Sequence, residues 1–192
     1  RPSFLLYAGR GRAGAAGRSM TAPKVLIAGI GNIFLGDDGF GCVVAERLAR
    51  RPLPDGAHVI DFGVRGFDLA YALMDGYDAT ILIDAVPRGG APGSLYVISP
   101  DLNEPNEPGA QAMMVEAHAM DPMRALGLAQ SMNVELKRVL LVGCEPATFG
   151  PEEGQMGLSE TVEAAVEVAV EIVESLVAAI LGDQRQLGAG AV

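Results

Sequence analysis

Acidic side chains follow two short apolar segments of the chain, near the points where those segments end. Asp38 comes after residues 25–28 (VLIA), and Asp84 lies near the end of residues 79–86 (ATILIDAV), the most apolar run of the sequence. A buried acid is costly without a partner, so we predict a functional role for Asp84. Of the two histidines, His118 lies in a predicted loop just before a helix start. Two carboxylates and an imidazole could form an open site for a divalent transition metal, completed by water or substrate.

Three apolar segments, separated by helical patterns, must position these side chains. Residues 25–28, 57–62 and 79–86 are predicted strands, and their alternation with helices indicates a parallel sheet covered on both faces. In a doubly wound sheet the first and third strands are commonly neighbours, and ligands bind beyond the carboxyl ends of the strands where the winding reverses. The fold alone would therefore bring Asp38 and Asp84 to one crevice.

The second half of the chain changes this rhythm. Residues 94–99 form a predicted strand that follows the third one too closely for a crossover helix, so we expect it to be antiparallel and near an edge. Residues 137–144 are the last predicted strand, and residues 149–157 are a predicted flexible loop. The predicted helices cover residues 40 to about 50, residues 67–74, a segment beginning at Asp121-Pro122, and a segment from Ser159 to about Leu181. We therefore predict an α/β fold, a three-layer α/β/α sandwich around a mostly parallel, twisted sheet of about five strands with one antiparallel strand.

The last predicted helix, which Ser159 is expected to cap, is amphipathic. Its apolar stripe is expected to face the sheet and consists of Val162, Val166, Ala169, Val170, Val173, Val177 and Ile180. Glu163, Glu167 and Glu171 line the other face, where like charges at this spacing slightly oppose one another. We interpret these acids as a solvated face, with a docking face for a basic partner as the alternative.

Length and composition indicate a single globular domain. The chain has 192 residues, of which 49% are apolar, which is enough to bury one substantial core. We assign the domain to residues 20–182 and interpret residues 183–192 as a flexible tail. Residues 1–19 are rich in Gly, Ala and Arg and lack the ordered regions of a signal peptide, so we interpret them as a non-native or disordered extension, with Met20 as the natural start.

The charge balance limits the possible partners. The net charge is −10, and all four charged residues before Met20 are arginines, so the rest of the chain has 24 acids, 10 bases and a charge of −14. Such a body should repel nucleic acid and anionic membranes, and a basic protein segment is a more natural partner. No uninterrupted apolar run approaches the roughly 18 residues needed to span a bilayer. We expect a monomer or a weak homodimer.

Several residues near the candidate site also have a simple structural interpretation. Asp37 could cap the helix that follows it, and Asn32 is expected to shape the preceding turn. Asp61 could stabilise a turn or support the rim of the crevice. Cys42 and Cys144 are too few for a disulfide framework or a structural zinc site, so we interpret them as reduced core residues of a cytoplasmic protein.

The turn after the first strand partly matches a dinucleotide-binding loop. The run GIGNIF, which begins at Gly29, supplies two glycines of the G-x-G-x-x-G pattern, but Phe34 stands where the third would be. Asp37 and Asp38 would also place negative charge beside a bound pyrophosphate. In favour of this interpretation, Asp61 ends the second strand, where a ribose-binding acid would lie. The balance is against a nucleotide site, which is kept as the alternative.

Several motifs in order resemble those of the hydrogenase maturation endopeptidases. They are GIGNIFLGDDGFG after the first strand, IDAV at the end of the third, EAHAMDP around the loop histidine, and VGCEP before the C-terminal helix. The resemblance runs from about Val25 to Val177. It implies a peptidase that removes the C-terminal extension from the large-subunit precursor of a nickel–iron hydrogenase.

The resemblance also implies roles for individual residues. The metal-recognising positions of the family fall on Asp38, Asp84 and His118, which we predict to be metal-binding and catalytic. The first of these is often Glu in the family and is the shorter Asp here. The metal is expected to be nickel carried by the precursor, with no organic cofactor. The predicted supporting or substrate-contacting residues are Gly31, Asn32, Asp37 and Asp61.

Two mechanistic questions stay open at this level. The sequence lacks the H-E-x-x-H and G-x-S-x-G motifs, so metal polarisation of the scissile carbonyl or of water, with a carboxylate as general base, must supply the chemistry. Asp38 is a candidate for ligand and for base, and both metal-dependent and aspartic-type mechanisms are compatible with these residues. The alternative function is a non-catalytic module, either nucleotide-binding or a metallochaperone-like protein that holds the metal-loaded precursor.

Overall fold

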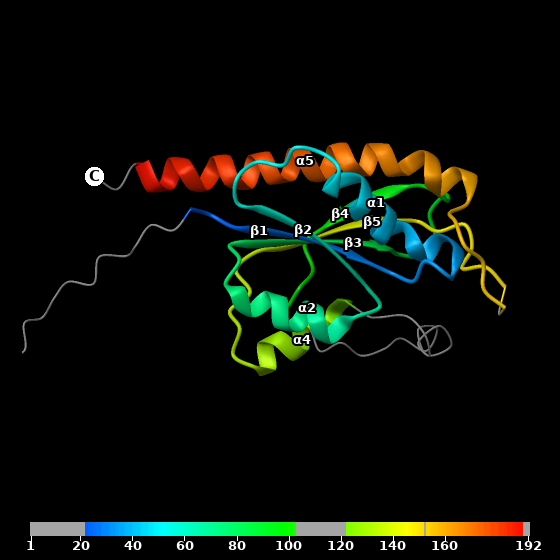
Figure 1. The fold of residues 1–192 in the computed structure, drawn as a ribbon, viewed down its shortest axis with the longest axis horizontal. Helices are drawn as coiled ribbons and strands as arrows, with labels where there is room; N and C mark the ends of the chain where they lie inside the picture. Colours follow the sequence, from blue (N-terminus) through cyan, green and yellow to red (C-terminus); the bar gives the residue numbers. More distant parts are fainter. Residues whose placement is uncertain (1–21, 103–121, 152, 190–192) are drawn as a thin grey trace, which may run out of the picture.

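A computed structural model of the protein describes residues 22–102, 122–151 and 153–189 (Figure 1). The predicted extension over residues 1–19 lies outside these ranges. The strands are β1 (Val25–Ile30), β2 (Ala57–Gly63), β3 (Ala79–Ala85), β4 (Leu95–Ile98) and β5 (Val139–Cys144). The helices are η1 (Gly36–Gly39), α1 (Phe40–Ala49), α2 (Gly66–Ala72), η2 (Leu73–Asp75), α4 (Pro122–Ser131) and α5 (Glu160–Ala189), where η marks a short 3₁₀ helix.

The five strands form one sheet in the order β2-β1-β3-β5-β4. β1 pairs with β2 and β3 in parallel, β3 pairs with β5 in parallel, and β4 pairs with β5 antiparallel. The predicted fold class is therefore confirmed, including the antiparallel strand at an edge. The chain goes from β1 to β2 on one side of it and then returns across β1 to β3 on the other side. The winding of the sheet therefore reverses between β1 and β3, as predicted.

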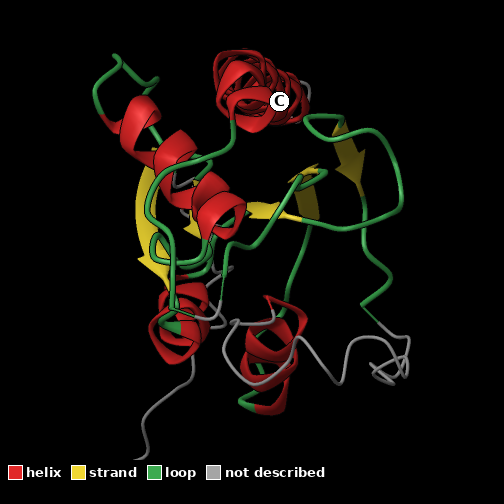
Figure 2. Ribbon diagram, turned by 90° about the vertical axis from the view of Figure 1, so that its right-hand side faces the viewer, coloured by secondary structure: helices red, strands yellow, loops and turns green. Residues whose placement is uncertain are grey.

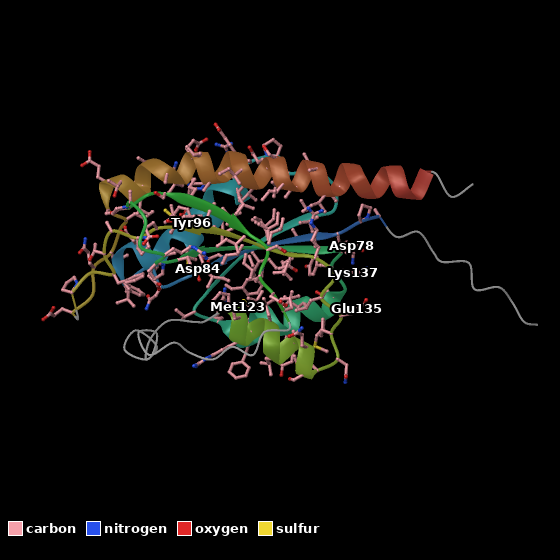
Figure 3. The ribbon with its side chains drawn as sticks, turned by 180° about the vertical axis from the view of Figure 1, so that it is seen from behind. Asp78, Asp84, Tyr96, Met123, Glu135 and Lys137 are labelled. Atoms are coloured by element: carbon pink, nitrogen blue, oxygen red, sulfur yellow. The ribbon has the colours of Figure 1, made fainter. Side chains whose placement is uncertain are left out.

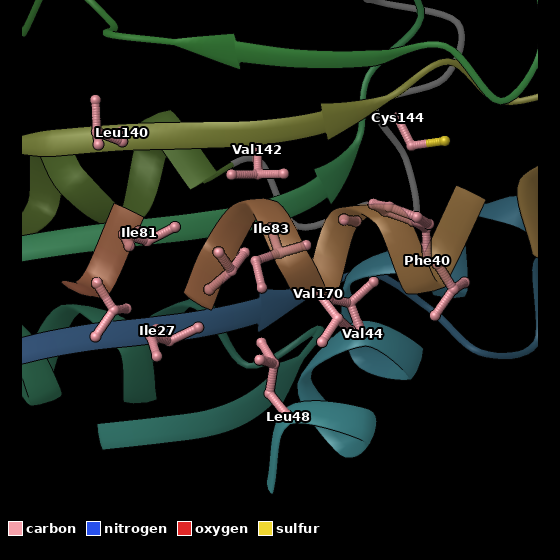
Figure 4. Packing of buried hydrophobic residues seen from close by; sticks show 14 of the residues in the cluster. Ile27, Phe40, Val44, Leu48, Ile81, Ile83, Leu140, Val142, Cys144 and Val170 are labelled. Atoms are coloured by element: carbon pink, nitrogen blue, oxygen red, sulfur yellow. The ribbon is translucent and has the colours of Figure 1, made fainter. Parts of the chain in front are cut away.

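Helices cover both faces of the sheet (Figures 1 and 2). α1 and α5 lie on one face, where Val25 and Ile27 point, and α2 and α4 lie on the other, where Leu26 and Ala28 point. Figure 4 shows the first of these cores, in which Val170 of α5 meets side chains of α1 and of the central strands. Since successive residues of a strand point to opposite faces, burial on both faces requires the continuous apolar runs seen in β1 and β3.

The stripe predicted on α5 is confirmed, because each of its seven residues is buried. Glu163, Glu167 and Glu171 are exposed, in agreement with the interpretation as a solvated face, but two of them also have partners within the chain. Arg47 donates to Glu163 over 2.8 Å, and Arg51 pairs with Glu167 and, over 3.2 Å, with Glu174. Part of the acidic face of α5 is therefore occupied by cations of α1, since α1 and α5 pack side by side on one face of the sheet.

α5 also continues to Ala189, beyond the predicted end near Leu181. Residues 183–189, which we predicted to belong to a flexible tail, thus have helical backbone, and residues 190–192 lie outside the described ranges. The apolar stripe ends at Ile180, but no proline follows it, so each following residue keeps the backbone N–H that continues the helix. Within the described ranges, no helix has both the length and the apolar character needed to cross a membrane.

α1 packs unusually close to the sheet. A Cβ on Gly41 would lie 2.0 Å from the carbonyl oxygen of Ile83 and 2.3 Å from that of Ile30. A Cβ on Gly29 would lie 2.5 Å from Cβ of Ala45. Close packing of helix on strand is the role of the third glycine of the dinucleotide fingerprint. Here Gly41 has that role, which explains why Phe34 can occupy the third position of the pattern.

We predict that Gly41→Ala lowers the free energy of unfolding by about 3 kcal/mol, because the added methyl group meets backbone atoms that cannot move without displacing α1. Gly127→Ala is the matched control, since Gly127 is exposed in α4 and its Cβ would have no neighbour within 4 Å. The control should gain about 0.5 kcal/mol. Urea unfolding of both variants measures the difference, and equal stabilities would contradict the close packing.

Candidate active site

Asp38 lies in η1, the single turn that joins β1 to α1. Its side chain is 7% exposed, and its Oδ2 accepts a hydrogen bond of 2.7 Å from the backbone N–H of Asn32. Gly31 makes this turn possible: it has a φ of 128°, and a Cβ there would lie 1.7 Å from the carbonyl oxygen of Asp38. Gly31 and Asn32, which we predicted to support the site, therefore both hold Asp38 in position.

Asp84 is the penultimate residue of β3, between β1 and β5 in the sheet. It is 8% exposed, and its Oδ1 accepts a hydrogen bond of 2.9 Å from the N–H of Ala85. η1 lies directly against β3, so the two acids share the carboxyl end of the sheet. Figure 3 shows Asp84 at this end, together with Tyr96, and the ion pair of Asp78 with Lys137 at the other end.

The surroundings of Cys42 show that three carboxylates lie near one another at the carboxyl end of the sheet. The thiol is buried and donates a hydrogen bond of 3.3 Å to the carbonyl oxygen of Gly31. Burial, together with the nearby Asp61 and the charges of Asp38 and Asp84, raises its pKa to about 12. A neutral thiol at this place is a core residue, as predicted. Asp61 therefore belongs to the same acidic cluster as the two predicted ligands.

Asp61 also stabilises a turn, which was the other interpretation of this residue. Its Oδ1 accepts a hydrogen bond of 2.9 Å from the N–H of Gly63, and the carbonyl oxygen of Gly63 accepts one of 3.1 Å from the N–H of Gly31. Similarly, Oδ1 of Asn32 accepts a hydrogen bond of 3.0 Å from the N–H of Phe34, the turn-shaping role predicted for Asn32. Both turns at the crevice are thus held by their own side chains.

Burial also changes the acidity of Asp38. Desolvation raises its pKa, and the hydrogen bond from Asn32 opposes this only in part. A carboxyl group with a raised pKa takes up a proton more readily than an exposed one, a property that general acid–base catalysis uses. The structure therefore gives Asp38 a suitable environment for proton transfer as well as for metal binding.

Asp37 was expected to cap α1, and this expectation is wrong. The N-cap of α1 is Gly39, and no side chain caps it. The fully buried carboxylate of Asp37 instead accepts hydrogen bonds from the N–H groups of Ala147, Thr148 and Ser159, over 2.7, 3.1 and 2.6 Å, and from the hydroxyl of Ser159, over 2.9 Å. It supports the site and cannot reach a substrate. Sequence spacing gave no sign of this role, because the donors lie more than a hundred residues away.

Glu145 is a buried acid that the sequence analysis did not select, although it directly follows β5. Its carboxylate accepts hydrogen bonds of 2.9 and 3.0 Å from the N–H groups of Arg88 and Gly89, and one of 2.8 Å from the hydroxyl of Tyr96. Burial alone would raise the pKa of Glu145, but these hydrogen bonds lower it. Glu145 thus holds the loop after Asp84. Its place at the end of a strand, like that of Asp84, was the available signal.

The third predicted ligand, His118, lies outside the described residues. Within residues 22–102, 122–151 and 153–189, no three His, Cys, Asp or Glu side chains are arranged to hold a metal ion. The described part supplies carboxylate oxygens only, and a carboxylate with a hydrogen bond on one oxygen keeps acceptor capacity for a cation. These donors fit a divalent cation held by further ligands from elsewhere.

A doubly wound α/β domain that presents buried acids where its winding reverses is the class of protein that this fold and site define. The family model described as hydrogenase maturation protease matches residues 42–176. The Hydrogenase 2 maturation protease of Escherichia coli is 31% identical over 150 residues, which cover 77% of this chain and 87% of that protein. The hydrogenase expression/formation protein HoxM of Azotobacter vinelandii is 35% identical over 154 residues, covering 80% of this chain and 72% of HoxM.

Solved structures agree with this relationship. The hydrogenase 2 maturation peptidase of a Thaumarchaeota archaeon is 36% identical with a TM-score of 0.59, over 78% of this chain and 95% of that one. The maturating endopeptidase HybD of E. coli is 29% identical with a TM-score of 0.59, over 78% of this chain and 89% of HybD. The chain therefore belongs to the hydrogenase maturation protease family. It is a peptidase, as the resemblance of its motifs implied.

We predict that Asp37→Asn lowers the free energy of unfolding by about 3 kcal/mol, because the new amide group would face buried N–H donors that lose their acceptor. Ser159→Ala removes only one of the four hydrogen bonds and should cost about 1 kcal/mol. Asp75→Asn, an exposed acid of η2, is the control and should change stability by less than about 0.5 kcal/mol. Urea unfolding that fails to rank the three variants in this order would contradict the role of Asp37.

A second prediction concerns Asp38 and pH. Because its folded pKa is raised above the ordinary value of 3.8, its contribution to stability is fully present below pH 3.8 and is lost as pH rises through the folded pKa. Asp38→Asn resembles the protonated acid, so the variant should have a higher Tm than the wild type at neutral pH, and the difference should disappear below pH 3.8. Thermal unfolding across this range tests the sign, and a lower Tm for the variant at neutral pH would refute it.

Proposed function

We propose that the protein removes the C-terminal extension of the large-subunit precursor of a nickel–iron hydrogenase after nickel has been inserted. The observation that carries this proposal is the convergence of the buried Asp38 and Asp84 at the carboxyl end of the sheet in a member of the hydrogenase maturation protease family. The name of the E. coli relative, Hydrogenase 2 maturation protease, supports a hydrogenase precursor as the substrate class. Cys42 and Cys144 are both free, which is compatible with a reducing compartment, and we place the reaction in the cytoplasm.

Nickel enters this scheme with the substrate. Asp38, Asp84 and His118 would complete the coordination shell of the precursor's metal, so that a precursor without nickel would lack one half of the recognition site. The bound metal would polarise the scissile carbonyl or the attacking water. Recognition by shared ligands would explain why processing waits for metal insertion.

Side chains of the protein would then transfer the proton of the attacking water. Asp38, whose pKa is raised by burial, would take a proton from the water that attacks the scissile carbonyl carbon. As the carbon–nitrogen bond breaks, the proton would pass to the leaving amine, so that one water is consumed and two chain ends form. Asn32 would hold Oδ2 of Asp38 throughout, and Asp61 would add negative charge that favours a cationic substrate centre.

The rival is a module that binds the precursor or a nucleotide without cutting anything. Family membership favours the peptidase, and the crowded backbone of the glycine turn, where Gly31 leaves no room for a side chain, is explained by the placement of Asp38 alone. Binding of NAD or ATP measured by calorimetry, with no effect of nickel, would favour the nucleotide-binding alternative.

We predict that Asp38→Asn, Asp84→Asn and His118→Ala each reduce processing by about a thousandfold or more, because each removes a group that acts on the reacting centre. The assay mixes each variant with nickel-loaded precursor and follows the shortened product on a gel. His58→Ala is the matched control, since His58 is the other histidine of the chain and is exposed on the edge strand β2.

Two results would count against the proposal. Normal trimming by all three variants would show that the site is elsewhere. Equal trimming of nickel-loaded and nickel-free precursor would show that nickel has no part in recognition, while leaving the peptidase activity itself in place.

A further inference from the structure

Large apolar side chains are exposed on the loops around the crevice. Among the described residues, nine large hydrophobic side chains are well exposed. Five of them lie on the loop after β1, on the loop after β2 with the first turn of α2, and on the loop before α5. These five, which we call the apolar rim, are Ile33, Phe34, Val64, Phe67 and Met156. Phe34 is 58% exposed, Phe67 71% and Met156 68%. An apolar cluster of this kind on a protein surface marks a site of interaction.

Backbone hydrogen bonds make the three loops neighbours. The N–H of Gly31 donates to the carbonyl oxygen of Gly63 over 3.1 Å, which joins the loop after β1 to the loop after β2. Two further hydrogen bonds join the loop after β1 to the loop before α5. The N–H of Gln155 donates to the carbonyl oxygen of Phe34 over 2.8 Å, and the N–H of Gly36 donates to the carbonyl oxygen of Gln155 over 2.7 Å. The loop after β1 therefore lies between the other two, so the residues of the apolar rim lie on adjoining segments.

The central loop is held in this arrangement. Asn32 accepts hydrogen bonds from its own turn, through Oδ1 from Phe34 and through its carbonyl oxygen from the N–H of Leu35, over 3.0 Å in both cases. Gly39 packs beneath, since a Cβ there would lie 3.2 Å from Cα of Ile33. Ile33 and Phe34 thus point outward because the backbone directs them there. A rigid exposed anchor loses little entropy when a partner covers it.

The apolar rim is continuous with the acidic crevice. The same Asn32 that directs Phe34 outward donates to Asp38, and the Gly63 bound by Asp61 precedes Val64. A partner that fits both parts carries positive charge opposite the acids and apolar side chains beside it. Anionic membranes and nucleic acid do not match this combination.

We propose that the apolar rim binds an extended, apolar stretch of the precursor chain next to the bond that is cut. This inference rests on the proposed function. It adds a second segment of the substrate that the protein recognises, outside the acidic cluster. An extended chain presents side chains at regular intervals to pockets and edges along its path. The loop that carries Ile33 and Phe34 leads directly to Asp38, and backbone hydrogen bonds join it to the loop after β2 and to the loop before α5, so a chain bound at Asp38 has the rim beside it.

The test is a combined variant, Phe34→Ser with Phe67→Ser and Met156→Ser, assayed on the nickel-loaded precursor. KM should rise by about tenfold or more with kcat unchanged, because the lost contacts act on binding and not on the reacting groups. The matched control combines Val97→Ser with Val168→Ser, two side chains that are each 49% exposed, on β4 and α5, away from the crevice. The control should leave both constants unchanged.

The same substitutions are also tested for equilibrium binding of the precursor in the Asp84→Asn background, which separates docking from cleavage. Weaker binding by the combined variant supports the inference even if the wild type cuts nothing, an outcome that would defeat only the proposed function. Unchanged KM and unchanged binding would overturn the inference, and so would a wild-type protein that does not bind the precursor.

Sedimentation shows whether a second copy of the chain covers the rim. A wild-type dimer that the combined variant abolishes, with KM unaffected, would also overturn the inference.

Discussion

The buried carboxylate of Asp37 is the interaction on which the arrangement of this protein depends. Its four hydrogen bonds join the turn after β1 to the segment after β5 and to the start of α5, which are separated by more than a hundred residues. A charged group in the interior is stable only when donors surround it, so these segments must come together for any of them to fold. Asp38, the next residue along the chain, takes its place from that junction.

Close packing supplies the second constraint. Gly41 lets α1 approach the ends of β1 and β3 so closely that no side chain would fit, and Gly31 lets the turn fold back over Asp38. Asp38 and Asp84 are consequently buried, while the nearby Asp61 is exposed. Burial of Asp38 costs stability, and it raises the pKa of a carboxyl group that has further negative charge nearby. Proteins retain such unfavourable arrangements where they serve a function.

Particular elements show how far the sequence could predict this structure. The continuous apolar runs of β1 and β3 and the stripe of α5 identified the sheet, its covering helices and the crevice shared by Asp38 and Asp84, because hydrophobic periodicity is a local property. Asp37 was mistaken for a helix cap, and Glu145 was overlooked, because their donors come from distant segments. The segment 149–157, predicted as a flexible loop, is tied to Phe34 and Gly36 by backbone hydrogen bonds that no periodicity reveals.

By itself, the sequence determined the fold class, the family and the two acids at the reversal of winding, since each depends on patterns along the chain. Only the tertiary structure decided that Asp61 joins the acidic cluster and that Glu145 holds the loop after Asp84. It also brought the segments of Phe34, Phe67 and Met156 side by side with these side chains exposed. The physical reason is that desolvation, charge proximity and exposure depend on which segments pack together, and packing is a property of the whole chain.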